Sequence, residues 1–257
     1  MIAALYVEEG GCYFGIEGVD PWPESRDARL YDGPWPVIAH PPCQRWGRYW
    51  GGSPRKPHQY QLGDDGGCFA AALAAVRKWG GVLEHPAHSH AWKAFALGTP
   101  NKNGGWSIAD PFGGVVCHVE QGHYGHIARK PTWLYAFASF AVTHQLRWGK
   151  SPQRLPDYAI ERYGYEKARR IGVMAAVGGK NKTKIRNATP VEFRDLLISI
   201  VTNGRVGVAA PAAANQGPAH QPGDDIGEGN ESVVHASKVS VEQRECPSIV
   251  TTEEFFA

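Results

Sequence analysis

A strand–helix–strand pattern in residues 36–83 constrains the fold of this chain more than any other feature. The apolar run Pro36–Ala39 is typical of a short buried strand, and Gly81–Leu83 begins another. Between them, Cys68–Trp79 has helical periodicity, basic residues in its last turn and Gly80 directly after it. This order of elements predicts an α/β domain built on an open sheet.

The other elements are expected on both sides of this unit. Further strand candidates are Ile2–Val7, Val115–Val119, Thr132–Phe137 and, more weakly patterned, Val142–Trp148. Residues 8–34 are rich in glycine, proline and charge, which indicates turns and at most one short element. A last helix is predicted at Thr189–Asn203, with Thr189 as N-cap and Glu192 closing a capping box.

Composition divides the chain into three parts: a catalytic α/β domain (1–149), a basic part that ends in the last helix (150–205), and a tail (206–257). The tail is rich in alanine, proline, glycine and acidic residues, and we expect it to be mostly disordered. It carries a net charge of −6, whereas residues 1–205 carry +8. A basic body suits a polyphosphate partner such as nucleic acid.

The chain shows no sign of a membrane or an oxidising compartment. No apolar run approaches the roughly 20 residues of a membrane span, and the N-terminus lacks the basic segment and cleavage site of a signal peptide. The 5 cysteines are widely spaced and odd in number, which favours a reducing compartment over a disulfide framework. We therefore expect a cytoplasmic protein without membrane contact.

Cys43 and Glu84 are the residues best placed to carry chemistry. Cys43 follows the first strand through a rigid Pro-Pro pair, and Glu84 follows the second strand. Ligands of open α/β sheets bind beyond the carboxyl ends of the strands, so the two side chains share one crevice if their strands are neighbours. A cysteine thiolate can add to C6 of a pyrimidine while a carboxylic acid of raised pKa protonates the N3 side of the ring. We expect Cys43 and Glu84 to take these two roles.

Two further segments supply polar and basic groups. The loop 44–67 contains several arginines and aromatic residues, and the segment 121–133 places Arg129 and Lys130 just before a predicted strand. Such a basic turn suits contact with a phosphate or an extruded base, although it is also typical of an ordinary solvated turn.

In motif order the chain resembles the DNA cytosine-C5 methyltransferases. Pro41-Pro42-Cys43-Gln44 matches the nucleophile motif of that family as written, and Glu84-His85-Pro86 resembles its Glu-Asn-Val or Glu-Asn-Pro motif with His85 in place of asparagine. The segment from Gln121 to Lys130 is similar to a loose Gln-x-Arg-x-Arg motif, with Arg129 as the best candidate for the arginine. The resemblance covers residues 36–135.

The resemblance implies a Rossmann-like methyltransferase sheet, shortened at the N-terminus, that acts on a flipped cytosine in DNA. The catalytic residues it implies are Cys43, Glu84 and Arg129. The substrate contacts it implies are Pro42, Gln44, Arg45, Gln121 and Lys130. The methyl donor would be S-adenosylmethionine, held by Gly11 and by Asp20, with Asp27 as the alternative acidic residue. Compact phage and prophage methylase-like proteins are the most similar type, so a phage-encoded chain would work in the host cytoplasm.

Other function classes stay open. One is a methyltransferase-like module that binds DNA without chemistry. Another is a metal-dependent hydrolase or nuclease, because His85-x-x-His88-x-His90 and Cys117-His118 with His123-x-x-His126 have spacings that zinc sites use. Those histidines are equally typical of residues that line a cleft or cap strands, and we assign no metal ligand. The motif order also allows a free nucleotide as substrate, or a different one-carbon donor.

Overall fold

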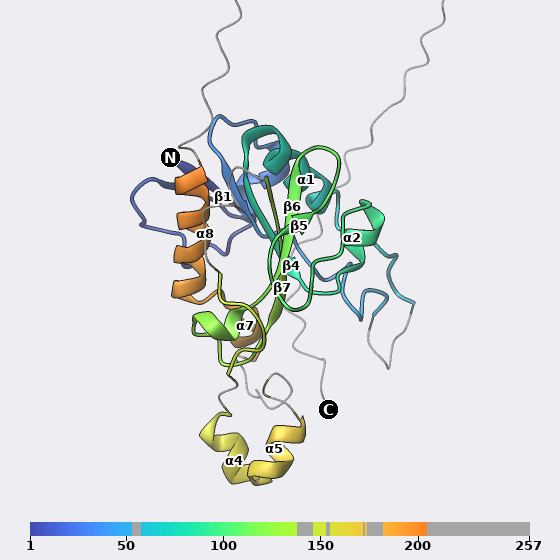
Figure 1. The fold of residues 1–257 in the computed structure, drawn as a ribbon, viewed down its shortest axis with the longest axis vertical. Helices are drawn as coiled ribbons and strands as arrows, with labels where there is room; N and C mark the ends of the chain where they lie inside the picture. The colour runs from blue at the N-terminus through green and yellow to red at the C-terminus, as the bar shows by residue number, and fades with distance from the viewer. Residues whose placement is uncertain (53–57, 138–145, 153–154, 172, 174–181, 205–257) are drawn as a thin grey trace, which may run out of the picture.

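A computed structural model describes residues 1–52, 58–137, 146–152, 155–171, 173 and 182–204, and shows an α/β fold around one mixed seven-stranded sheet (Figure 1). The strands are β1 (Ile2–Leu5), β2 (Val19–Trp22), β3 (Val37–Ala39), β4 (Gly81–Pro86), β5 (Ser107–Ile108), β6 (Gly114–Glu120) and β7 (Pro131–Phe137). They lie in the order β2-β1-β3-β4-β7-β6-β5. The first four are parallel, while β7 runs antiparallel to both β4 and β6, and β5 runs antiparallel to β6.

Two long helices cover the sheet. The α-helices are α1 (Cys68–Trp79), α2 (His90–Ala94), α4 (Asp157–Tyr163), α5 (Tyr165–Ile171), α7 (Lys182–Asn187) and α8 (Val191–Asn203), and the 3-10 segments are η1 (Glu24–Arg26), η2 (Ala28–Leu30) and η3 (Gln121–Tyr124). Helices α1 and α8 belong to two different hydrophobic clusters, one on each face of the sheet. Figure 1 shows α4 and α5 side by side and apart from the sheet.

Strand β1 shows how one short apolar segment serves both clusters. Ala3 and Leu5 point into the α1 cluster, whereas Ile2 and Ala4 point into the α8 cluster. A strand buried on both faces has to be apolar at every position, because alternate side chains point to opposite faces. The continuous apolar run at the N-terminus is thus the expected sequence of a central strand.

The predicted strand–helix–strand unit is confirmed. Helix α1 has the predicted bounds, with Phe69, Leu73 and Val76 buried on one face. It ends at Gly80, which has φ 77° and whose N–H donates to the Val76 carbonyl. The strands that flank it, β3 and β4, are parallel neighbours in the sheet.

Two strands add to or differ from the prediction. Strand β2 is the one short element allowed within residues 8–34, and it contains Pro21. It lies at the edge of the sheet, where a strand can lack one donor N–H without leaving a neighbour unpaired. Strand β4 runs on to Pro86 because β7 pairs with it, Glu84 opposite Leu134. Glu84 is therefore inside a strand, not beyond its end.

The predicted capping box of the last helix is wrong. Helix α8 begins at Val191, and Pro190 occupies the N-cap position with no side-chain cap hydrogen bond. Pro190 has an extended backbone (φ −59°, ψ 148°), so Thr189 lies one residue too far from the first helical turn to cap it. Phe193, Leu197 and Ile200 nevertheless form the predicted buried face.

Some predictions fall on other parts of the chain. The tail 206–257 and residues 142–145 of the weak strand candidate lie outside the described residues. Within the ranges that the structure describes, no helix is long and apolar enough to cross a membrane.

Candidate active site

The candidate site is built on the parallel register of β3 and β4. Ala39 lies opposite Leu83 at the last paired position. The next residues along the two strands are His40 and Glu84, so they face each other on the same side of the sheet. His40 Nδ1 lies 3.0 Å from Glu84 Oε2, and the two side chains are only 13% and 12% exposed.

Both oxygens of the Glu84 carboxylate have a partner. His40 contacts Oε2, and the Gln121 side-chain amide donates to Oε1 over 3.2 Å. The same amide nitrogen also donates to the Thr132 hydroxyl over 3.0 Å, which ties η3 and β7 to the site. Glu84 is thus held in one orientation from both sides of its strand.

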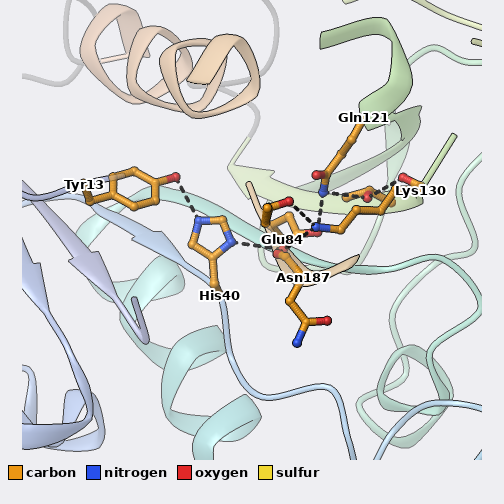
Figure 2. A network of polar contacts seen from close by, with 8 residues as sticks. Tyr13, His40, Glu84, Gln121, Lys130 and Asn187 are labelled. Atoms are coloured by element: carbon orange, nitrogen blue, oxygen red, sulfur yellow. Dashed lines mark hydrogen bonds and ion pairs between the residues drawn. The ribbon is translucent and has the colours of Figure 1, made fainter. Parts of the chain in front are cut away.

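Tyr13 continues the network on the other side of His40. Its hydroxyl lies 2.9 Å from His40 Nε2, as Figure 2 shows. Tyr13 belongs to the loop between β1 and β2, and it is buried. Three segments that are distant in sequence therefore meet in the order Tyr13, His40, Glu84.

Lys130 is the cation of the site. Its ammonium donates to the backbone carbonyls of Asn187 and Ala188 over 3.0 and 2.8 Å, so the end of α7 anchors it (Figure 2). Burial lowers the pKa of Lys130, while the Glu84 carboxylate and the Cys43 thiolate oppose this effect. Lys130 is therefore close enough to both predicted catalytic groups to change their ionisation.

The charge on Glu84 differs from the prediction. Burial by itself would raise the pKa of Glu84, but the hydrogen bond from His40 and the charges of His40 and Lys130 outweigh it, and the pKa is lowered. The expected carboxylic acid of raised pKa is therefore wrong for the protein without substrate. Glu84 is a carboxylate near neutral pH, and it needs a proton before it can act as an acid.

Cys43 is exposed to solvent on the loop after β3. Burial nevertheless raises the pKa of its thiol, the nearby Glu84 carboxylate adds to the effect, and Lys130 opposes it. The structure thus brings Cys43, Glu84 and Lys130 together.

Arg129 is oriented differently from Lys130. Its Nε donates to the Ser151 carbonyl over 3.3 Å and lies 3.9 Å from a carboxylate oxygen of Glu120. Glu120 in turn accepts hydrogen bonds from the backbone and hydroxyl of Ser151. In the protein without substrate, Arg129 therefore belongs to this separate cluster.

The residues that flank Cys43 face solvent or the following loop. Pro42 and Gln44 are exposed. The Arg45 guanidinium lies 3.4 Å from the centre of the Tyr60 ring. The loop therefore presents polar and basic groups beside the thiol.

The loop after β1 combines two features expected of a cofactor site. Strand β1 lies between β2 and β3, and ligands of open α/β sheets bind where the strand order reverses in this way. Gly10 has φ 63° and open space where a side chain would lie, whereas a side chain at Gly11 would meet the Glu8 carbonyl. Asp20 on β2 is engaged by the guanidinium of Arg26. Of these residues, only Gly10 leaves open space for a ligand, because Gly11 is required by the turn with Glu8 and Asp20 is already engaged by Arg26.

The histidines do not gather into a metal centre. Among the described residues, no group of three His, Cys, Asp or Glu side chains could hold a metal ion. His85 is buried against Phe69 and Trp92, and burial lowers its pKa to about 4. His88 and His90 line a cavity of about 700 Å³ on the α1 side of the sheet.

The histidines of the second zinc-like pattern have separate partners. His118 accepts a hydrogen bond from Trp133 Nε1, and His123 Nε2 lies 3.2 Å from the Gly149 carbonyl. His126 is buried and contacts its own loop. These contacts are those of residues that support strands and turns.

Sequence reasoning missed His40, Tyr13, Asn187 and Ala188. His40 could have been found from the sequence, because it is a polar residue at the end of an apolar strand. If that strand pairs in parallel with the strand of Glu84, the two side chains face each other. The other three could not, because Tyr13 and the 187–188 backbone reach the site only through folding. Comparison with protein-family models finds no match for the chain, and a search of curated protein sequences finds no relative.

Proposed function

We propose that the protein modifies a pyrimidine base, most simply cytosine in DNA, through a covalent adduct between the Cys43 thiolate and C6 of the ring. The observation that carries the proposal is the juxtaposition of the exposed Cys43, on the loop after β3, with the partly buried, hydrogen-bonded Glu84 on the neighbouring parallel strand β4. A protein that only binds DNA has no need of a thiol and a carboxylate in this register. Motif order and the arrangement of the sheet together support a Rossmann-like methyltransferase fold.

Each residue of the site has a separate role in the proposed reaction. Cys43 supplies the nucleophile, and Lys130 stabilises its thiolate against the opposing effects of burial and of Glu84. Glu84, held by Gln121 and His40, faces the N3 side of the ring as the proton donor. The residues Gln44 and Arg45 are next to the extruded base and its phosphates.

The methyl donor belongs at the loop after β1. S-adenosylmethionine bound there would supply an electrophilic methyl group for C5 of the activated ring. Gly10 and Gly11 would hold it through backbone groups, and the carboxyl ends of β1 and β3 would form the walls of its crevice.

Nucleoside mass spectrometry of DNA tests the proposal. DNA from cells that express the wild type, Cys43→Ala or Cys68→Ala would be digested and compared. We expect a modified deoxycytidine with the wild type and with Cys68→Ala, whose thiol is buried in α1, and none with Cys43→Ala. The mass of the product identifies the transferred group.

Two results would contradict the proposal. Modification that persists in Cys43→Ala excludes the covalent mechanism. Unmodified DNA with a folded wild-type protein excludes DNA cytosine as the substrate, and the same assay on free pyrimidine nucleotides then tests the nucleotide-level alternative.

A further inference from the structure

The partly buried hydrogen-bond chain of Tyr13, His40 and Glu84 has a further consequence for the proposed reaction. We propose that His40 stores the proton that Glu84 passes to N3 of the substrate ring, so that the three residues form a proton relay. The inference rests on the proposed function and adds a catalytic partner to it.

The geometry suits proton transfer between His40 and Glu84. Nδ1 and Oε2 are 3.0 Å apart, and the two side chains are only 13% and 12% exposed to solvent. Because water has little access to the pair, a proton on it moves between the two partners more readily than to solvent.

Charged and titratable groups from several elements lie near the relay. Within the described residues, Lys130 from the turn before β7 and His85 from β4 act on Glu84 besides His40, and Glu84 in turn acts on Cys43 from the loop after β3. Those that act on Tyr13, besides Glu84, are Cys12, Arg194 and Asp195.

A proton shared by His40 and Glu84 explains how Glu84 can be ionised without substrate and still act as a proton donor. The pair can exist as imidazolium with carboxylate, or as neutral imidazole with carboxylic acid, and the two forms differ only in where the proton lies. The lowered pKa of Glu84 favours the carboxylate, so in the proposed relay the proton starts on His40. A basic N3 atom placed against the carboxyl group draws the proton across, because only the second form can donate to it.

The addition step then balances. The Cys43 thiolate forms a bond to C6, the C5–C6 π electrons move to C4–C5, and the C4–N3 π electrons move to N3. N3 takes its proton from Glu84, which takes the Nδ1 proton of His40, and His40 becomes neutral. Reversal of the addition returns the proton to the pair.

Tyr13 supplies a hydrogen-bond partner for the second ring nitrogen of His40. Burial raises the pKa of Tyr13, so its phenol stays neutral. Its hydroxyl, 2.9 Å from Nε2, can accept from Nε2–H in the imidazolium and in the neutral form that the relay leaves after proton transfer. In the proposed relay the proton that moves is the one on Nδ1, which faces Glu84.

The test measures release of tritium from C5 of a tritiated cytosine oligonucleotide, which reports the addition step without needing a methyl donor. His40→Asn keeps a side-chain N–H toward Glu84 but stores no proton. We expect it to release tritium about 100-fold more slowly than the wild type near neutral pH and to recover at lower pH, where Glu84 takes a proton from water. Tyr13→Phe, the matched control, keeps proton storage and should lose much less.

Three results would overturn the relay. The first is a His40→Asn variant with the wild-type rate and pH profile, and the second is a variant that is slow by the same factor at every pH, which indicates a positioning role only. The third comes from ¹⁵N NMR of the histidine rings in the free protein. There we expect a larger imidazolium fraction at His40 in the wild type than in Glu84→Gln across the range where histidines titrate, and equal fractions contradict the proton-sharing pair.

The two readouts separate this inference from the proposed function. A wild type that releases no tritium contradicts the proposed chemistry, and the NMR comparison still decides whether His40 and Glu84 share a proton.

Discussion

Two opposite charges act on the Cys43 thiol. Burial raises its pKa above the ordinary value of 9.0, the Glu84 carboxylate adds to the increase, and the Lys130 ammonium opposes it. The thiolate is the reactive form, so the reactivity of Cys43 without substrate should rise with pH through neutrality and beyond 9.0. In the proposed reaction, a substrate ring that binds the proton shared by His40 and Glu84 would change the effect of Glu84 on the pKa of Cys43 when the thiolate attacks.

This balance predicts opposite effects of two substitutions on alkylation of Cys43. At a fixed pH near 8, Glu84→Gln should raise the rate of reaction with iodoacetamide roughly threefold or more, because it removes a negative charge. Lys130→Met should lower the rate by a similar factor, because it removes the stabilising cation. Peptide mass spectrometry measures the rate at this site, and Cys43→Ser shows the background. Equal rates in both variants would contradict the electrostatic coupling.

At the scale of elements, the site depends on how closely β3 and β4 approach each other. Gly81 has φ 116°, and a side chain there would collide with the Val37 carbonyl oxygen across the ladder. Only glycine fits this conformation and this close approach. Because the same ladder sets His40 opposite Glu84, Gly81 is a structural requirement of the site.

Gly81→Ala should therefore lower the free energy of unfolding by more than about 2 kcal/mol. Gly105→Ala is the matched control, because Gly105 also has positive φ (86°) but has nothing within 4 Å of the new methyl group. It should cost about 1 kcal/mol from backbone strain alone. Urea denaturation measures both, and equal losses would show that the close approach to Val37 is unimportant.

At the scale of the whole molecule, the charge is unevenly distributed along the chain. Residues 1–205 carry +8 and residues 206–257 carry −6. In the proposed complex with DNA, the acidic part would repel phosphates and compete with them for the basic body, so it should weaken binding.

Removal of residues 206–257 should therefore tighten binding of a short DNA duplex. Fluorescence anisotropy at several salt concentrations should show a lower Kd for the truncated protein at low salt, and the two curves should converge as salt screens the charges. A full-length chain carrying Gln in place of the eight acidic residues of the tail is the control for length. Unchanged affinity in both would contradict competition between the tail and DNA.

Elements set by interactions between residues close in the sequence could be predicted, and elements set by contacts between distant segments could not. Helix α1 was predictable to the residue because its buried stripe and the glycine at its end are local properties. Strand β2 was not, because Pro21 argues against a strand unless the edge position is known. Thr189 gave a misleading cap signal because the backbone at Pro190 is extended, and the choice between the two residues depends on how α8 packs on the sheet.

The sequence alone determined the strand–helix–strand unit and the identity of Cys43 and Glu84 as a candidate pair, since both depend on local pattern and on residue chemistry. Tertiary structure decided the state of that pair. It set His40 against Glu84, brought Lys130 rather than Arg129 to the site, and lowered the pKa of Glu84 that had been expected to rise. The reason is physical: ionisation depends on the charges and hydrogen bonds within a few ångströms, and these came from residues that are distant in the sequence and adjacent only in the folded chain.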